Sequence, residues 1–274
     1  MNSLSELSFS SHADAFRGAL SLEAVRQRAP AIFAASADDR RSHRYTFIPT
    51  QRVLTGLMQA GFEPVDVRQT HTRSASPLHA RHIVRLRRTY ETIQLRDAIP
   101  EIIFLNSHDG TSAYQLRMGL FRVICTNGLI VSRGAFAAVC VSHRGDIVEQ
   151  VVTGAVGIAE RFVELAGQIE AMERRRMFKD EQLQFAGHAL ALRYGDPWQA
   201  GMSEAQLLSC RREQDAGDDL WSTLNRVQEN LLAGGLSRRS ASGRLVRTRR
   251  ITSIREDVRI NGALWDLARE VLAA

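Results

Sequence analysis

Lysine is almost absent from this chain, because Lys179 is the only one among 36 basic residues and the other 35 are arginine. A phosphate-binding loop of the Gly-x-x-x-x-Gly-Lys-Ser/Thr type needs a lysine directly after glycine, whereas Lys179 follows Phe178. Schiff-base catalysis would have to use this one side chain, near a helix end. The sequence therefore excludes nucleotide hydrolysis by a P-loop and disfavours lysine chemistry.

Cysteines and uninterrupted apolar runs are also scarce. The three cysteines, Cys125, Cys140 and Cys210, are odd in number and widely spaced, which indicates reduced thiols and not a disulfide scaffold. The first 30 residues carry charges among the apolar positions, which argues against a signal-peptide core. The longest apolar tract, 147–169, is interrupted by four charged residues. We therefore expect a cytoplasmic protein with no membrane span.

Acidic residues are missing from two arginine-rich stretches, 67–90 and 234–250, which together hold twelve of the 36 basic residues. The rest of the chain then has 24 basic residues against 30 acids and is formally −6. Positive charge concentrated on an otherwise acidic body is typical of proteins that bind a polyanion. The composition therefore predicts a class of partner and leaves any reaction open.

The first half of the chain has the pattern of β structure with a few helices. Apolar spacing predicts a helix over 14–28 and another that begins with Thr50 as its N-cap and ends at Gly61. The pair Asn127-Gly128 indicates a tight turn between strands. Strands are predicted over 63–72, 80–90, 101–105, 112–125 and 135–141.

The second half has helical periodicity. Apolar residues three and four apart predict one long helix over 148–172, with or without a kink, although three glycines weaken it. Further helices are predicted over 180–193, 203–212, 218–233 and 254–273. The fold class we expect is α+β, with a mostly antiparallel sheet and flanking helices in residues 1–145 and a helical region in 146–274. The pattern leaves open whether these are two domains or one continuous domain.

The first basic stretch contains a strand with charge on one side. Alternation places Arg81, Arg85 and Arg87 on one face, with side chains two residues apart separated by roughly 6.6 Å, comparable with phosphate spacing. Such a face can follow a nucleic acid backbone, but the solvated outer side of a sheet explains the same pattern. His79 and His82 would point to opposite faces of the strand, so no metal site is expected.

The second basic stretch, 234–250, mixes glycine, serine and arginine without hydrophobic periodicity before Leu245, which predicts a mobile arm or long loop. Arginines in such arms contact phosphates and release counterions when nucleic acid binds. The alternative is a solvated linker whose arginines pair with Asp215, Asp218 and Asp219. The arginines of this stretch are Arg238, Arg239, Arg244, Arg247, Arg249 and Arg250.

A polar turn lies between two predicted strands in the middle of the chain. It consists of Asn106, Ser107, His108, Asp109 and Gly110, with glycine supplying a backbone angle that other residues resist. An enzyme interpretation makes His108 a general base oriented by Asp109, with Cys125 as nucleophile. We favour the interpretation in which His108 and Asp109 hydrogen-bond the turn, and we assign no catalytic residue.

The strand after this turn carries two further arginines. If Gly119 marks a β-bulge, Arg117 and Arg122 fall on the same face and extend the stripe of the first basic stretch. A helical interpretation of the same segment would break this alignment. We count both arginines among the candidate nucleic-acid-binding residues.

A family resemblance rests on residues 105–114, Arg117 and 121–129, which we call the central motif, on the pair Val53-Leu54, and on five other segments. The chain resembles the DUF932 family of phage-, prophage- and plasmid-associated bacterial proteins, and within it the enterobacterial prophage branch. The resemblance implies residence on a mobile element, where nucleic acid is a common partner, and it supplies no catalytic residue. The other segments are 45–50, 61–64, 81–86, 227–232 and Leu264-Trp265.

We therefore expect a non-enzymatic nucleic-acid-binding protein that needs no cofactor and that aids replication, recombination or strand annealing. Single-stranded DNA is the preferred partner, because the sequence has no helix-turn-helix or zinc module. The helical half is a candidate for self-association into a homo-oligomer. Two alternatives stay open: an interaction protein whose arginines bind an acidic surface of a host factor, and a hydrolase centred on His108.

Overall fold

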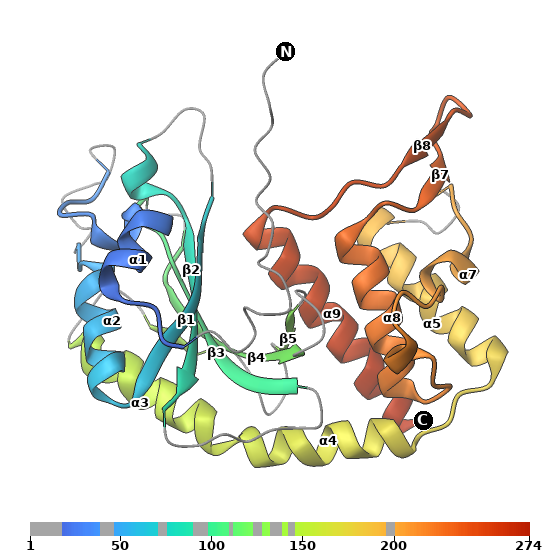
Figure 1. Ribbon diagram of the computed structural model, residues 1–274, viewed down its shortest axis with the longest axis horizontal. Helices are drawn as coiled ribbons and strands as arrows, with labels where there is room; N and C mark the ends of the chain where they lie inside the picture. Colours follow the sequence, from blue (N-terminus) through green and yellow to red (C-terminus); the bar gives the residue numbers. More distant parts are fainter. Residues whose placement is uncertain are drawn as a thin grey trace. The chain divides into compact units, whose positions relative to one another are not determined.

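The chain divides into two compact units in a computed structural model that describes residues 18–38, 47–70, 76–89, 98–109, 112–122, 128–131, 139–141, 146–195 and 201–274 (Figure 1). The sheet unit contains residues 1–114, 119–128 and 141–152. The helical unit contains residues 115–118, 129–140 and 153–274. The predicted boundary between residues 145 and 146 stays a prediction, and the fold class is confirmed as α+β.

The sheet contains strands from the first half of the chain. Their order is β1-β2-β3-β4-β5, with β6 pairing with β4, and both β1–β2 and β2–β3 are antiparallel. Every residue of β3 is buried, so this strand forms the centre of the core. The predicted antiparallel sheet is thereby confirmed. The strands are β1 (Phe62–Gln69), β2 (His82–Arg88), β3 (Ala98–Asn106), β4 (Tyr114–Arg122), β5 (Gly128–Val131) and β6 (Val139–Val141).

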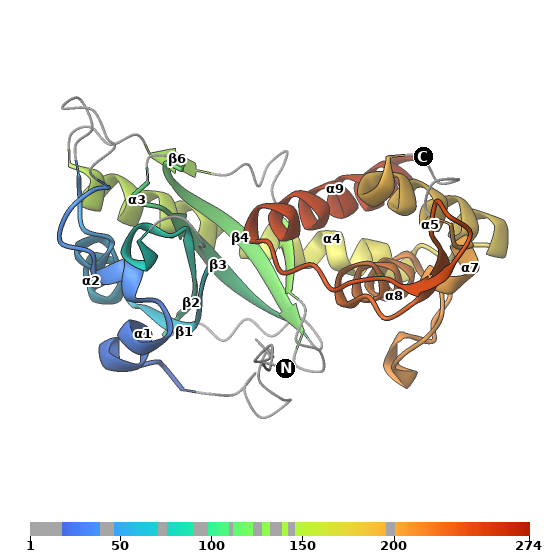
Figure 2. The ribbon, with the colours of Figure 1, turned by 90° about the horizontal axis from the view of Figure 1, so that it is seen from above.

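Two helices cover one face of this sheet (Figures 1 and 2). They are α1 (Leu22–Arg28), which is followed by a 3₁₀ turn at Pro30–Phe33, and α2 (Thr50–Gln59). The predicted N-cap is wrong, because Pro49 precedes α2 and Thr50 is its first helical residue. The predicted stop at Gly61 is confirmed by its φ of 86° just after the helix. Residues 14–17 of the predicted first helix lie outside the described residues.

The predicted long helix is divided into α3 (Ile147–Glu160) and α4 (Phe162–Arg174). The break lies at Arg161, with φ −91° and ψ 2°, and not at a glycine. The buried side of α4 contains Phe162, Leu165, Ile169 and Met172. The three- and four-residue spacing of the apolar residues therefore predicted the buried face, but not the place of the break.

The helical unit is built around α8 (Leu220–Ala233), where every residue from 220 to 232 is buried. Neighbouring helices surround it (Figure 2). They are α4, α5 (Lys179–Tyr194), α7 (Glu204–Leu207) and α9 (Ile254–Ala273), with a 3₁₀ turn at Glu213–Asp215. The predicted helix over 203–212 is too long, because Asn230 of α8 donates hydrogen bonds to the carbonyl oxygens of residues 207 and 209.

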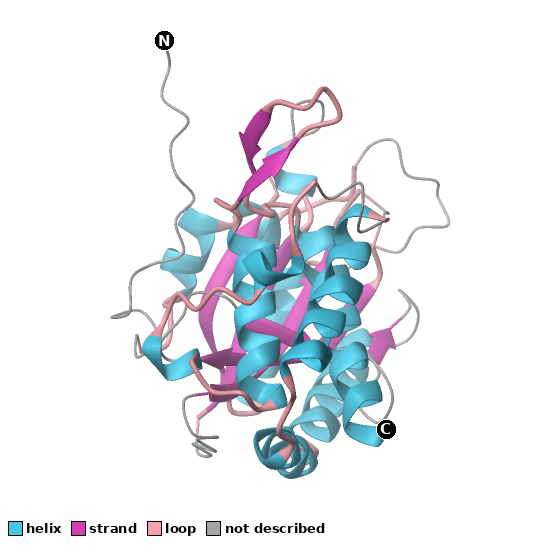
Figure 3. Cartoon of the chain, turned by 90° about the vertical axis from the view of Figure 1, so that its right-hand side faces the viewer, coloured by secondary structure: helices cyan, strands magenta, loops and turns pink. Residues whose placement is uncertain are grey.

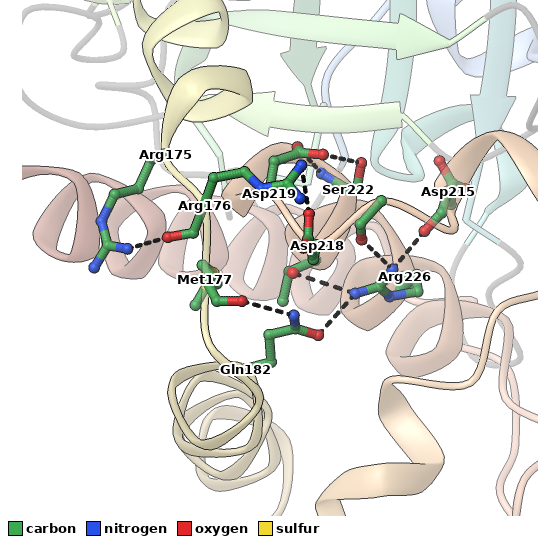
Figure 4. A network of polar contacts seen from close by, with 11 residues as sticks. Arg175, Arg176, Met177, Gln182, Asp215, Asp218, Asp219, Ser222 and Arg226 are labelled. Atoms are coloured by element: carbon green, nitrogen blue, oxygen red, sulfur yellow. Dashed lines mark hydrogen bonds and ion pairs between the residues drawn. The ribbon is translucent and has the colours of Figure 1, made fainter.

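The buried polar residues of α8 are hydrogen-bonded within the helical unit. Arg226 donates to the carbonyl oxygens of Asp215 and Gly217, both at 2.6 Å, and to Gln182 Oε1 at 3.0 Å (Figure 4). Arg212 Nη2 lies 2.9 Å from Glu229 Oε1. These contacts satisfy groups whose burial would otherwise be costly, and they join α8 to the segment before it.

Candidate nucleic-acid interface

The arginines of β2 bind a buried carboxylate on the neighbouring strand. Glu101 of β3 is fully buried, and it accepts hydrogen bonds from Arg85 Nε at 2.7 Å and from Arg87 Nη2 at 2.8 Å. The guanidinium carbon of Arg85 also lies 3.4 Å from the ring centroid of Phe121. Asp66 of β1 approaches Arg85 Nη1 at 3.7 Å. The charge of this strand face is therefore balanced from within the sheet unit.

The expectation that Arg85 and Arg87 follow a phosphate backbone stays a prediction, and these ion pairs count against it. A phosphate would have to displace Glu101, which would leave a carboxylate buried without its partners. The sequence around β2 contains no acid, so it did not predict these ion pairs. Their carboxylate belongs to Glu101 on the adjacent strand β3. Arg81 is half-exposed just before β2.

Arg117 of β4 is partly buried, and its side chain bonds to a neighbour on the same strand. Arg117 donates to Gln115 Oε1 at 3.0 Å, and burial lowers its pKa from the usual value, with Cys140 acting in the opposite direction. The side chain of Arg122 lies outside the described residues, so the alignment of the two arginines stays a prediction. Gly119 allows close packing, because an added Cβ would lie 2.7 Å from Phe121 and 2.8 Å from Ile103.

The predicted polar turn lies beside a buried cluster centred on Thr50. The Thr50 hydroxyl oxygen is 2.8 Å from Asn106 Nδ2, 3.0 Å from His108 Nε2 and 3.1 Å from His82 Nε2. All four residues are fully buried. Ser107 donates to Asp109 Oδ1 at 2.7 Å. Gly110 and Cys125, the remaining residues of the turn and of the enzyme interpretation, lie outside the described residues.

The hydrogen bonds of this cluster, taken together, indicate which of its nitrogen and oxygen atoms donate and which accept. His82 Nδ1 lies 3.0 Å from the Ala80 carbonyl oxygen and must donate to it. Burial lowers the pKa of His82 to about 4, against smaller opposing effects of that bond and of Asp109, so its Nε2 accepts the Thr50 proton. Thr50 then accepts from Asn106 and from His108. This arrangement joins α2 to the sheet and leaves no exposed nucleophile among these groups.

The second basic stretch forms a two-stranded antiparallel hairpin and not the predicted loop. Strands β7 (Ser237–Arg239) and β8 (Leu245–Arg247) pair in the register Ser237–Arg247, Arg238–Val246 and Arg239–Leu245. The hairpin projects from the helices of its unit (Figures 1 and 3). We call the segment 234–250 the arginine hairpin.

Strand alternation gives the arginine hairpin two different faces. The outer face has Ser237, Arg239, Leu245 and Arg247, and Leu245 is 72% exposed. On the inner face, the guanidinium carbon of Arg238 lies 5.2 Å from the ring centroid of Tyr194 in α5. Arg244 in the turn, and Arg249 and Arg250 after β8, are exposed.

Four arginines of the hairpin have no carboxylate partner among the residues that the structure describes: Arg239, Arg244, Arg247 and Arg249. Two of the acids considered as partners are engaged elsewhere. Asp218 lies 2.7 Å from Arg176, and Asp219 caps α8 by accepting from Ser222 (Figure 4). Asp215 is buried. The hairpin is therefore an exposed cationic surface.

Backbone contacts hold the base of the arginine hairpin. The Arg239 amide donates to the Gly201 carbonyl oxygen at 2.7 Å, and Gln206 Nε2 donates to the Ser237 carbonyl oxygen at 2.8 Å. Gly201 has φ +64°, and a Cβ there would lie 2.1 Å from the Arg239 carbonyl oxygen. Only glycine fits this approach. Gly201, which precedes α7, and Gln206 of α7 thus position the hairpin.

The hairpin was missed in the sequence because its strands are short and polar. A weak signal was present in the glycines: Gly234 and Gly235 precede the first strand, Gly243 lies in the turn between the two strands, and all three adopt positive φ. Tyr194, which lies beneath Arg238, carried no signal at all.

Among the described residues, no group of three or more His, Cys, Asp or Glu side chains is arranged to hold a metal ion. None of the described helices combines the length and apolar character needed to cross a membrane.

The fold and this surface define a class of protein, an α+β protein that combines an antiparallel sheet and a helical unit with an exposed arginine hairpin. The chain belongs to the family described as "Domain of unknown function (DUF932)", whose model matches residues 39–265. It is 41% identical over 254 residues to UPF0380 protein YafZ and to UPF0380 protein YfjQ, both from Escherichia coli (strain K12). Each alignment covers 92% of both chains. No solved structure matches. The predicted family resemblance is confirmed.

Proposed function

We propose that this protein binds nucleic acid through the arginine hairpin. The supporting observation is that Arg239, Arg244, Arg247 and Arg249 are exposed without a carboxylate partner in the described part of the chain. Positive charge held without internal compensation attracts polyanions and accelerates their encounter with the protein. Both basic stretches were expected to contact nucleic acid. We assign this contact to the hairpin, because Arg85 and Arg87 of the first stretch are paired with Glu101.

The proposed setting is a phage, prophage or plasmid in a bacterial cytoplasm. In that setting, the protein would bind nucleic acid during replication, recombination or strand annealing. Binding through guanidinium groups requires no cofactor. Self-association of the helical unit would multiply a weak contact by avidity. The segment 234–250 contains no acid, so no carboxylate within it repels the phosphates of a nucleic acid.

The test is fluorescence anisotropy with the full chain and labelled 30-nucleotide single strands and 30-base-pair duplexes. If the four arginines each contact a phosphate, log K falls with log salt at a slope of about −3.6 on duplex and about −2.8 on single strands. Between 50 and 200 mM KCl, duplex affinity then falls on the order of 10²-fold.

A variant with glutamine at all four positions (Arg239, Arg244, Arg247 and Arg249) should lose most of this salt dependence. The matched control replaces four arginines outside the hairpin, so that net charge changes equally: Arg161, Arg174, Arg176 and Arg255. Control binding should stay within about threefold of the unaltered chain, because carboxylates already offset the charge of Arg161, Arg174 and Arg176. No complex with either probe at 50 mM KCl would overturn the proposal and favour an acidic protein surface as partner.

A further inference from the structure

The outer face of the arginine hairpin has the dimensions of an element that reads duplex nucleic acid. Arg239 and Arg247 occupy diagonal positions on this face, because Arg239 pairs with Leu245 and Arg247 pairs with Ser237. Diagonal neighbours on antiparallel strands lie roughly 7–8 Å apart. Two base-pair steps of a duplex span about 6.8 Å. The two guanidinium groups can therefore address base pairs two steps apart.

A two-stranded ribbon fits one groove of a duplex and not the other. Its strands are separated by about 4.8 Å before side chains are added. The major groove is about 12 Å wide and admits such a ribbon, whereas the minor groove is about 6 Å wide. The geometry of the hairpin thus favours entry into the major groove.

The outer arginines keep hydrogen-bond donors for a ligand. Arg247 uses Nη1 to donate to the Gly235 carbonyl oxygen at 2.7 Å, and Arg239 uses Nη1 to donate to the Gly243 carbonyl oxygen at 3.2 Å. A guanidinium has five N–H groups, so each keeps a pair of donors. Paired donors match the O6 and N7 acceptors of guanine, and the exposed Leu245 between them suits a thymine methyl group.

Single-strand binding needs a stacking surface that this segment lacks. Residues 234–250 contain no Phe, Tyr or Trp, and nearby Tyr194 already lies beneath the guanidinium groups of Arg238 and Arg193. The sequence-based preference for single strands rested on the lack of helix-turn-helix and zinc modules. A β-ribbon is a third kind of element that reads a groove of the duplex. The lack of helix-turn-helix and zinc modules therefore no longer favours single strands over duplex as the partner.

We infer that the arginine hairpin enters the major groove of duplex DNA, with Arg239 and Arg247 donating to guanine bases. This inference rests on the proposed nucleic-acid binding and names its substrate class. With Arg239 and Arg247 on bases, Arg244 and Arg249 are the hairpin arginines left for phosphates, and the salt slope on duplex becomes about −1.8. Gly201 and Gln206 hold β7 by backbone contacts, so the ribbon is presented in a fixed orientation and not as a flexible tail.

The test is dimethyl sulfate footprinting of a 30-base-pair duplex bound by the full chain, together with competition by unlabelled single strands. Dimethyl sulfate methylates guanine N7 in the major groove and adenine N3 in the minor groove, so one reagent reports both. We expect protection at guanine N7 alone, and at least tenfold weaker competition by single strands than by duplex.

Two matched variants separate base reading from charge. R239Q/R247Q removes the outer-face pair, and R244Q/R249Q removes the same charge from the same segment. At saturating protein, guanine N7 protection should vanish in the first and persist in the second, with each lost arginine–guanine pair reducing binding by tenfold to a hundredfold at its preferred site.

Three results would overturn the inference: protection at adenine N3, unchanged protection in R239Q/R247Q, or equal competition by single strands. In each case a complex still forms, so the proposed function stands. Absence of any complex overturns the proposed function itself.

Discussion

Replacing Glu101 by leucine should destabilise the sheet unit strongly, because Arg85 and Arg87 would lose their common anion. The carboxylate is fully buried, whereas the two arginine side chains are 15% and 22% exposed. Removing one partner of a buried ion pair costs about 3–5 kcal/mol, and the partial exposure of the arginines places this case near 3 kcal/mol. That loss corresponds to a change on the order of 10²-fold in the equilibrium for opening.

Hydrogen exchange followed by mass spectrometry measures this loss where it occurs. Peptides covering 82–88 and 98–106 should exchange on the order of 10²-fold faster in Glu101→Leu, since they contain both sides of the ion pair. Glu164→Gln is the control, because its ion pair with Arg161 is exposed and should change the free energy of unfolding by less than about 1 kcal/mol.

A triple variant tests the physical reason. Adding Arg85→Met and Arg87→Met to Glu101→Leu replaces the ionic group by apolar side chains and should restore most of the protection. If Glu101→Leu alone exchanges like the control, the arginines do not depend on this carboxylate. The charged face of β2 would then be available to a polyanion as a second surface beside the hairpin.

Three further predictions concern other parts of the molecule. Gly201→Ala places a Cβ 2.1 Å from the Arg239 carbonyl oxygen and should detach the arginine hairpin, seen as faster proteolysis within 234–250; unchanged cleavage would contradict the contact. Because the pKa of His82 is lowered to about 4, the unfolded chain binds a proton below pH 6.5 that the folded chain does not. The free energy of unfolding should therefore fall by about 3 kcal/mol between pH 6.5 and pH 4, and a difference in slope between the unaltered chain and His82→Gln in urea melts isolates this effect; equal slopes would refute it. Asn230→Ala should cost about 1–3 kcal/mol, because the buried Leu207 carbonyl group and the part-buried Ser209 carbonyl group lose their donor. Its urea midpoint, read by tryptophan fluorescence of the helical unit, should fall, and an unchanged midpoint would argue against this role.

Local periodicity predicted most helices and strands, because their buried faces follow from the spacing of apolar residues. The core strand β3 and the buried face of α4 are examples. Family membership was also predicted from the central motif and its flanking segments.

Contacts between elements were not predictable in this way. The pairing of Arg85 with Glu101 depends on the register of β2 against β3, which no residue of either strand specifies alone. Thr50 was expected to cap a helix, but His82 and His108 approach its hydroxyl from distant parts of the chain. The hairpin escaped prediction because Gly201 and Gln206, which hold it, are outside the stretch.

The burial of α8 on all sides has a consequence for synthesis on the ribosome. Gln228 of α8 donates to Asn261 of α9, and both Leu264 and Trp265 of α9 are fully buried. When residue 253 has just been added, all the strands of the sheet have been made, but the helix that completes the cover of α8 has not. The helical unit must therefore close after translation has passed α9, while the sheet unit can fold earlier. Until then, the side of α8 that later contacts α9 stays open to chaperones and proteases.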